Sequence, residues 1–574
     1  TKAQLLNPLG ELSSSDVTVN SISIGKGANS VAGNTVLGET ALDASVSGGN
    51  NTAIGKDALT ALTSGASNVA VGANALDANT TADNNTAVGK DALTTNSTGS
   101  GNTAVGKGAS LGNTTGTDNT AVGLSALYTN STGGDNVAVG RSALENNTTA
   151  SNNTAVGHDS LKANTTGTLN TAVGSLALDS NTTGDNNTAV GYDSLGANTT
   201  GAGNTALGRG SLDANTTANN NTGLGYFALT ANTTGASNTA VGSDALAANT
   251  TASNNTAVGL SALAANTTGA SNTAVGAECL DAVTTGGDNT GVGYAAGSSL
   301  TTGSNNTYLG RRAGHTNSSG SNNLAIGRSA MEDATNTANN VCIGNTAGFA
   351  LQTDNNTAVG HEALKANTTG RENTAFGSQT MESNTTGEFN DAFGRDALGT
   401  GSGFDSCCAF GNSALKVNTG DDNAAFGFVS LGSNTSGAAN TAVGSQALDA
   451  LTTASECVAV GADAGGACTT GIRNTFLGRD AGHNLTTGQA NVFVGEACVA
   501  SSVSVDVENC LGAGLTGKGN QTTFIGGTNG TFNNQNSQNF ATTSDERIKK
   551  NIVDNNSGLD ILNQIQVRNF EYRT

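Results

Sequence analysis

The 574-residue sequence has no tryptophan, one proline and only 12% charged residues. Leucine, isoleucine and phenylalanine are too sparse for several compact globular cores, which argues against an ordinary multidomain protein. Basic residues are scarce too: 23 lysines and arginines face 44 acidic residues, giving a net charge of −21. Because phosphate binding needs clustered basic side chains, we expect no nucleic-acid partner. No run of about 18 apolar residues is present, so we expect no membrane span.

Cysteine and histidine are few and scattered. The eight cysteines form no C-x-x-C pair, which argues against a zinc site. We expect buried free thiols, with bridges between chains as the alternative. The four histidines are too far apart in sequence to suggest a metal site, so we expect no metal and no cofactor. The sequence starts without methionine or a signal peptide, and we interpret it as a processed or partial chain.

A short sequence motif repeats along most of the chain. Residues 85–101 read NTAVGKDALTTNSTGSG, and NTAVG begins again at residues 102 and 119. Twenty-nine such coils start between residues 34 and 508, spaced by 17 residues except for two intervals of 16. One shorter coil flanks the array on each side, SISIG from Ser21 and TTFIG from Thr522. A fixed period of this length indicates a solenoid.

Each coil is numbered here from its first residue, so that Asn85 is position one of coil 85. Positions two to four favour a short strand, in which neighbouring side chains face opposite sides. We expect the larger side chain at position four, such as Val88, to point into the coil, and the small one at position three, such as Ala87, to point outward. Gly89 at position five permits a turn, and Leu93 at position nine enters the interior. A small apolar column facing outward predicts close packing of several chains, and we expect a homotrimer.

Exceptions to the repeat support a packed interior. Five coils carry glycine at position nine, and in four of them position twelve becomes apolar instead. The interior therefore takes one large side chain from either place. Four consecutive coils carry phenylalanine at position four, which we interpret as a stack in the core, with an exposed receptor-binding knob as the alternative. The position-nine glycines are Gly297, Gly314, Gly348, Gly465 and Gly482, and the apolar residues at position twelve are Leu300, Leu351, Cys468 and Leu485. The four phenylalanines are Phe376, Phe393, Phe410 and Phe426.

The predicted fold class is all-β. We expect a parallel β-roll or β-helix solenoid of about 31 coils, assembled as a homotrimeric rod, with a short α-containing C-terminal segment. The expected organisation is an N-terminal connector over residues 1–20, the repeat shaft over 21–530, a polar linker over 531–543 and a separate C-terminal segment over 544–574.

The NTAVG element resembles the NSVAIG-type repeats of trimeric autotransporter adhesin heads, which are left-handed parallel β-rolls. It is also similar to fibre proteins of phages and algal viruses that carry long NTAVG arrays. The resemblance covers about residues 20–530. It implies a trimeric β-roll and is far less specific for function than for fold.

The C-terminal sequence SDERIKK, residues 544–550, resembles the opening of the endosialidase-type intramolecular chaperone domain of phage tailspikes and fibres. The resemblance implies that the segment trimerises, guides folding of the stalk and cuts itself at the Ser544–Asp545 bond. It assigns Ser544 as nucleophile and Lys549 as base, with Asp545 and Arg547 completing the motif. A serine hydroxyl does need a neighbouring base before it can attack. The alternative is an uncut domain that still trimerises.

Three functions compete. The first is a virion fibre: a trimeric rod at the virion surface, outside the cell, that joins an attachment protein of the virion at its N-terminal end and binds a host receptor such as a glycan. The second is a bacterial trimeric surface adhesin, a class that ends in a membrane-anchoring segment rather than in SDERIKK. The third is an ice-binding solenoid, suggested by the threonine column at position two and opposed by the lack of a second threonine at position four.

Overall fold

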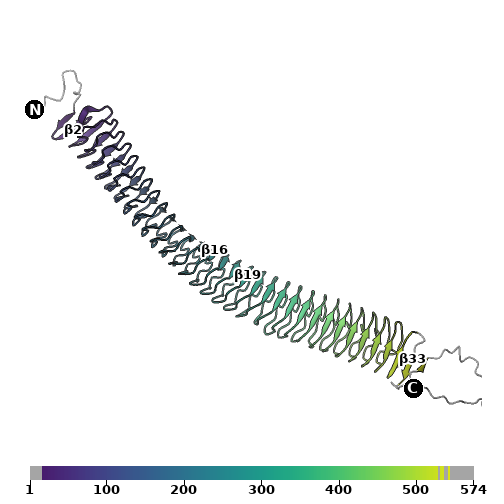
Figure 1. Ribbon diagram of the computed structural model, residues 1–574. Coiled ribbons are helices and arrows are strands. Elements are labelled where there is room, and N and C mark those ends of the chain that lie inside the picture. Colours follow the sequence, from purple (N-terminus) through teal and green to yellow (C-terminus); the bar gives the residue numbers. More distant parts are fainter. Residues whose placement is uncertain (1–15, 528–530, 535–540, 543–574) are drawn as a thin grey trace, which may run out of the picture. The chain divides into compact units, whose positions relative to one another are not determined.

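The computed structural model describes residues 16–527, 531–534 and 541–542. The chain divides into two compact units, residues 1–373 and 374–574. Each is an all-β parallel solenoid in which one short strand per coil stacks on the next (Figure 1). Together they contain about 29 turns of the 17-residue repeat, so the predicted solenoid is confirmed. The described residues contain one helical turn, the 3-10 segment η1 (Ala28–Ser30).

The strands of the first unit are β1 (Val17–Val19), β2 (Ile22–Gly25), β3 (Thr35–Gly38), β4 (Thr52–Ile54), β5 (Val69–Val71), β6 (Thr86–Val88), β7 (Thr103–Val105), β8 (Thr120–Val122), β9 (Val137–Val139), β10 (Thr154–Val156), β11 (Thr171–Val173), β12 (Thr188–Val190), β13 (Thr205–Leu207), β14 (Thr222–Leu224), β15 (Thr239–Val241), β16 (Thr256–Val258), β17 (Thr273–Val275), β18 (Thr290–Val292), β19 (Thr307–Leu309), β20 (Leu324–Ile326), β21 (Val341–Ile343) and β22 (Thr357–Val359). Those of the second are β23 (Thr374–Phe376), β24 (Asp391–Phe393), β25 (Cys408–Phe410), β26 (Ala424–Phe426), β27 (Thr441–Val443), β28 (Val458–Val460), β29 (Thr475–Leu477), β30 (Val492–Val494), β31 (Asn509–Leu511), β32 (Thr522–Ile525), β33 (Thr531–Asn534) and β34 (Ala541–Thr542).

Neighbouring coils pair in register, each residue with its equivalent one repeat later. Thr154 of β10 pairs with Thr171 of β11, and Ala155 with Ala172. Backbone hydrogen bonds between coils continue beyond the strands: the N–H of Leu161 donates to the carbonyl of Ala177 at 3.0 Å. The coils are therefore bonded to their neighbours through the return stretch as well as through the sheet.

The two faces of the strand are the reverse of the prediction. In coil 153, Ala155 at position three is fully buried, whereas Val156 at position four is half-buried and faces outward. The same alternation holds for every strand of the 17-residue repeats. The expectation of an outward alanine column at a trimer axis is therefore wrong. The coil is thin, and the leucine of the return stretch leaves room for little more than a methyl group opposite it.

The return stretch supplies the large interior side chain, as predicted. Leu161 at position nine is fully buried. Its backbone is left-handed, with a φ of 50°, and Asp159 two residues earlier has a φ of 58°. A leucine rarely adopts this conformation. Burial of the side chain and the hydrogen bond of its N–H to the next coil offset the backbone strain.

The turn after the strand depends on glycine. Gly157 has a φ of 141°. A Cβ placed there would lie 2.3 Å from the carbonyl oxygen of Gly174 in the next coil. The backbones of adjacent coils approach too closely at position five for any side chain, which confirms the predicted role of this glycine.

Large residues at position three replace the leucine of position nine. The ring of Tyr308 is fully buried and occupies the space between Gly297 and Gly314. A Cβ on either glycine would lie 2.6 Å or 2.4 Å from that ring. Phe476 lies in the same way between Gly465 and Gly482. The apolar residues expected to compensate from position twelve are also buried: Leu300, Leu351, Cys468 and Leu485.

The ends of the array differ in part from the prediction. The segment SISIG from Ser21 is not a further parallel coil, because β2 pairs antiparallel with both β1 and β3. TTFIG does continue the array, since β32 pairs parallel with β31. The interval interpreted as a polar linker contains β33 and β34, which pair antiparallel with each other. The expected α-containing segment lies outside the described residues.

Candidate functional site

The residues assigned from the SDERIKK motif, Ser544, Asp545, Arg547 and Lys549, lie outside the described residues. Their roles stay predictions. The other candidate sites lie in the repeat array.

Two columns of buried asparagine run through the coils, at positions one and twelve. Asn170 at position one donates its side-chain N–H to the carbonyl of Gly184 in its own coil at 2.8 Å. Its Oδ1 accepts the backbone N–H of Asn187 in the next coil at 2.9 Å. Asn181 at position twelve likewise donates to Oδ1 of Asn164 at 2.9 Å. These ladders satisfy polar groups that the narrow interior would otherwise leave unpaired.

The sequence interpretation missed these ladders because it treated asparagine as a turn residue. The signal was present: few coils carry anything but asparagine at position one, and the exceptions include Cys407, Cys457 and Glu508. Turn residues tolerate exchange among several polar types. Near-invariance within one chain instead indicates a specific buried partner.

A stripe of apolar side chains lies on the outer face of the strands. In each unit every position-four residue of the 17-residue coils is half-buried or exposed. Leu207 of the first unit is 48% exposed, and Val460 of the second 41%. We call these columns the position-four stripe. Large apolar residues at a fixed place in every coil, facing solvent in a single chain, are typical of a contact surface.

Four phenylalanines form the aromatic part of this stripe in the second unit. The rings of Phe376, Phe393, Phe410 and Phe426 stack on one another, with centroids 5.9, 4.6 and 5.0 Å apart. Phe376 is 49% exposed. The interpretation of these residues as a core stack is therefore wrong, and they belong to the outer surface.

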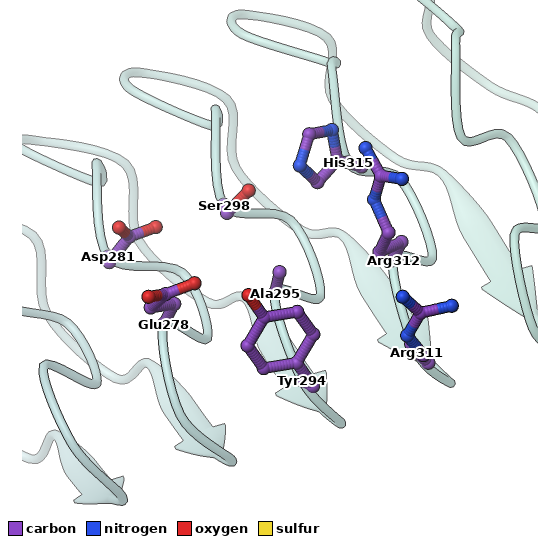
Figure 2. A pocket seen from close by; sticks show the side chains of 8 residues that line it. All are labelled: Glu278, Asp281, Tyr294, Ala295, Ser298, Arg311, Arg312 and His315. Atoms are coloured by element: carbon purple, nitrogen blue, oxygen red, sulfur yellow. The ribbon is translucent and has the colours of Figure 1, made fainter.

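A notch interrupts the first unit at coils 272, 289 and 306. Its volume is about 270 Å³. The middle coil carries small residues at positions seven and ten, Ala295 and Ser298, where most coils carry longer side chains. Figure 2 shows Glu278 and Asp281 on one side of this gap and the arginines and histidine of coil 306 on the other. The lining residues are Glu278, Asp281, Tyr294, Ala295, Ser298, Arg311, Arg312 and His315.

The opposite walls of the notch do not pair with each other. Oδ1 of Asp281 and Nδ1 of His315 are buried and have no hydrogen-bond partner among the described residues. Arg312 turns to Glu332 of the following coil, with 2.7 Å between Nη1 and Oε1. Arg311 makes no ion pair within the described part of the chain. The notch is therefore a hollow between an acidic wall and a basic wall.

Burial shifts the protonation equilibria in the notch. It raises the pKa of Asp281, and the nearby charge of Glu278 adds to this rise. Burial and, after it, the charge of Arg312 lower the pKa of His315. Glu278 accepts a hydrogen bond from the hydroxyl of Tyr294 and so raises the pKa of that phenol. At neutral pH these directions leave the histidine uncharged, so the arginines carry the positive charge of their wall.

Seven of the eight cysteines are buried, as expected, and only Cys408 is not; no cysteine is bonded to another of the same chain. Burial raises the pKa of Cys342 to about 12. The thiols of Cys457 and Cys468 approach the same carbonyl, that of Gly471, at 3.2 and 3.4 Å. They replace the asparagines of positions one and twelve in coil 457. Within the described residues no group of three or more histidine, cysteine or acidic side chains is arranged to hold a metal ion.

Comparison with family models, with curated proteins and with solved structures found no match. No helix in the described part of the chain is long and apolar enough to cross a membrane.

Proposed function

We propose that the chain is the shaft of a homotrimeric virion fibre, in which three parallel copies pack in register through the position-four stripe. The stripe is the observation that carries the proposal. The resemblance to phage and algal-virus fibres supplies the number of copies and the place at the virion surface. In this assignment the N-terminal end joins the virion and the fibre serves host attachment.

Packing through the stripe is energetically sufficient. A valine or leucine that is about 40% exposed gains about 1 kcal/mol when the rest of its surface is covered. Association of the chains costs on the order of 4–15 kcal/mol. Because every coil contributes one such residue per chain, a modest number of coils offsets this cost. In-register packing also explains why the same position is apolar in each coil.

The proposal is tested by sedimentation equilibrium of the full chain. Val156→Glu, Val173→Glu and Val190→Glu together bury nine unpaired carboxylates in the stripe of a trimer, each costing several kcal/mol. We expect the variant to dissociate at concentrations where the wild-type trimer persists. The matched control places the same charges in the same coils at position six, by His158→Glu, Ser175→Glu and Tyr192→Glu, and should stay trimeric. A wild-type monomer, or equal loss in both variants, would contradict the proposal.

The C-terminal segment sets the register of the three chains in this proposal. A slip by one repeat costs little in an array of near-identical coils, so a non-repeating segment must fix the alignment. Deleting residues 544–574 before synthesis should therefore give misaligned or aggregated assemblies. If the Ser–Lys dyad is active, Ser544→Ala and Lys549→Ala should each block cleavage at Ser544–Asp545 without preventing trimerisation.

Ice binding is the second candidate, and the outer face of the strands favours it more than the sequence did. Threonine at position two and valine at position four point to the same side, as Thr171 and Val173 do, and repeat at the strand spacing. One comparison distinguishes ice binding from the fibre. A wild-type chain that is monomeric and shows thermal hysteresis would support ice binding, whereas a trimer without hysteresis would support the fibre.

A further inference from the structure

We propose that the notch at coils 272, 289 and 306 binds a compact zwitterion, such as an amino acid, whose cationic group contacts Asp281 and Glu278 and whose carboxylate contacts Arg311, Arg312 and His315. The site lies at positions six, seven and ten, away from the position-four stripe. The proposal is independent of the assembly of the chain.

Charge selects the class of ligand. Glu278 and Asp281 form one wall of the notch, and Arg311 and Arg312 belong to the other (Figure 2). A simple anion attracted to the arginines meets two carboxylates, and a simple cation meets two guanidinium groups. A molecule with one charge of each sign satisfies both walls. Arg312 keeps free N–H groups for this contact, because a guanidinium has five donors and Glu332 does not use them all.

Geometry selects the size. The two walls come from coils separated by one intervening coil, so their backbones are about two strand spacings, or roughly 9.5 Å, apart. A hydrogen bond at each end takes up about 2.9 Å. For wall side chains that project parallel to each other from these backbones, the charged atoms of the ligand lie about 4 Å apart. An α- or β-amino acid fits this separation, whereas a long-chain amino acid does not.

The remaining lining residues suit such a ligand. Ala295 and Ser298 form the floor, and both are small, so the ligand reaches both walls (Figure 2). The ring of Tyr294 is 48% exposed beside them and offers an apolar surface for the ligand's carbon atoms.

Isothermal titration calorimetry of the full chain at low ionic strength tests the proposal, with β-alanine as the probe. Acetate and methylammonium each carry one of its charges, and 6-aminohexanoate carries both at a larger separation. We expect saturable binding of β-alanine, at least tenfold tighter than binding of any of the three. Equal binding of acetate or of methylammonium would reduce the notch to a simple ion site and overturn the proposal, as would no binding of β-alanine.

A lysine substituted into the floor of the notch gives a variant that tests the site. Lys162 occupies position ten of an ordinary coil and lies 3.9 Å from Glu145 of the preceding coil. Ser298→Lys should likewise fold, pair with Asp281 and fill the gap, and it should weaken β-alanine binding at least tenfold. Thr230→Lys, at the same repeat position outside the notch, is the control and should bind as wild type does. Circular dichroism verifies that both fold. Unchanged binding by a folded Ser298→Lys variant would exclude this site.

Discussion

Asn187 contacts Asn170, one coil earlier, through two donors: its backbone N–H and its side-chain N–H lie 2.9 and 3.2 Å from Oδ1 of Asn170. Both asparagines are fully buried. The pair is one rung of a ladder that joins consecutive coils inside the solenoid. Polar bonds of this kind, rather than a large apolar core, connect the coils internally.

Removing one rung should destabilise the stack. Asn170→Ser leaves the buried backbone N–H of Asn187 without its acceptor, whereas the carbonyl of Gly184 keeps the side-chain N–H of Asn181 at 3.0 Å. This loss should cost about 1–3 kcal/mol. Hydrogen exchange of the backbone amides in residues 153–203 measures this loss of stability. Asn186→Ser, one residue before Asn187, changes an exposed turn residue with a φ of 58° and should be nearly silent. Equal protection in the two variants would mean that the ladder does not stabilise the fold.

The two faces of the strand predict opposite responses to charge. Ala155→Asp buries an unpaired carboxylate in the coil interior and should unfold coil 153 and its neighbours, because such burial costs several kcal/mol. Val156→Asp places the same group on the outer face and should leave the coil folded. Hydrogen exchange again provides the measurement. A coil that tolerates Ala155→Asp and loses protection with Val156→Asp would reverse the assignment of faces.

Much of the fold followed from the repeat. The period, the strand at positions two to four, the glycine turn and the buried leucine at position nine were all predictable, because each depends on local geometry or on the one large apolar residue of the return stretch. Which face of the strand points into the coil was not predictable. Ala87 and Val88 are both apolar, so alternation alone cannot tell which is inside, and preference for the larger residue gave the wrong answer.

A signal for the correct face was present in the exceptions. Tyr308 and Phe476 are large at position three where position nine is glycine, at Gly314 and Gly482, and Phe493 is large where position nine is the smaller Val499. Residues that exchange volume in this way share one space, so position three had to be inside. The notch was harder to predict, because its charged walls belong to coils that are not adjacent and become a site only when the strand spacing is known.

This exchange of volume predicts a coupling between Tyr308 and Gly314. Gly314→Leu restores the usual residue but collides with the ring and should cost at least about 1–3 kcal/mol. Tyr308→Ala should leave a cavity. The double variant restores the ordinary coil, so its loss should be smaller than the sum of the single losses by about 0.5–3 kcal/mol. Urea unfolding of the four proteins measures this cycle, and strict additivity would contradict the shared space.

A row of carboxylates predicts that the stability of the fold depends on pH. Burial, and then the charge of Asp193, raise the pKa of Asp213 above its usual value of 3.8. The folded state therefore binds this proton more tightly than the unfolded state, and stability falls as the pH rises from 3.8 through the raised pKa. Asp213→Asn should raise the melting temperature at pH 7, and the gain should shrink as the pH approaches 3.8. A gain that grows on acidification would contradict this assignment.

Chemical crosslinking tests the central claim, that the position-four stripe joins the chains, most directly. Leu207 and Arg209 are exposed and lie two residues apart, on the stripe and beside it. Leu207→Cys and Arg209→Cys are each made with Cys408→Thr, which removes the one cysteine that is not buried. With a short bismaleimide, we predict that Leu207→Cys gives a covalent two-chain product and Arg209→Cys stays a single chain on a denaturing gel. Crosslinking of Arg209→Cys alone, or of neither variant, would contradict the account.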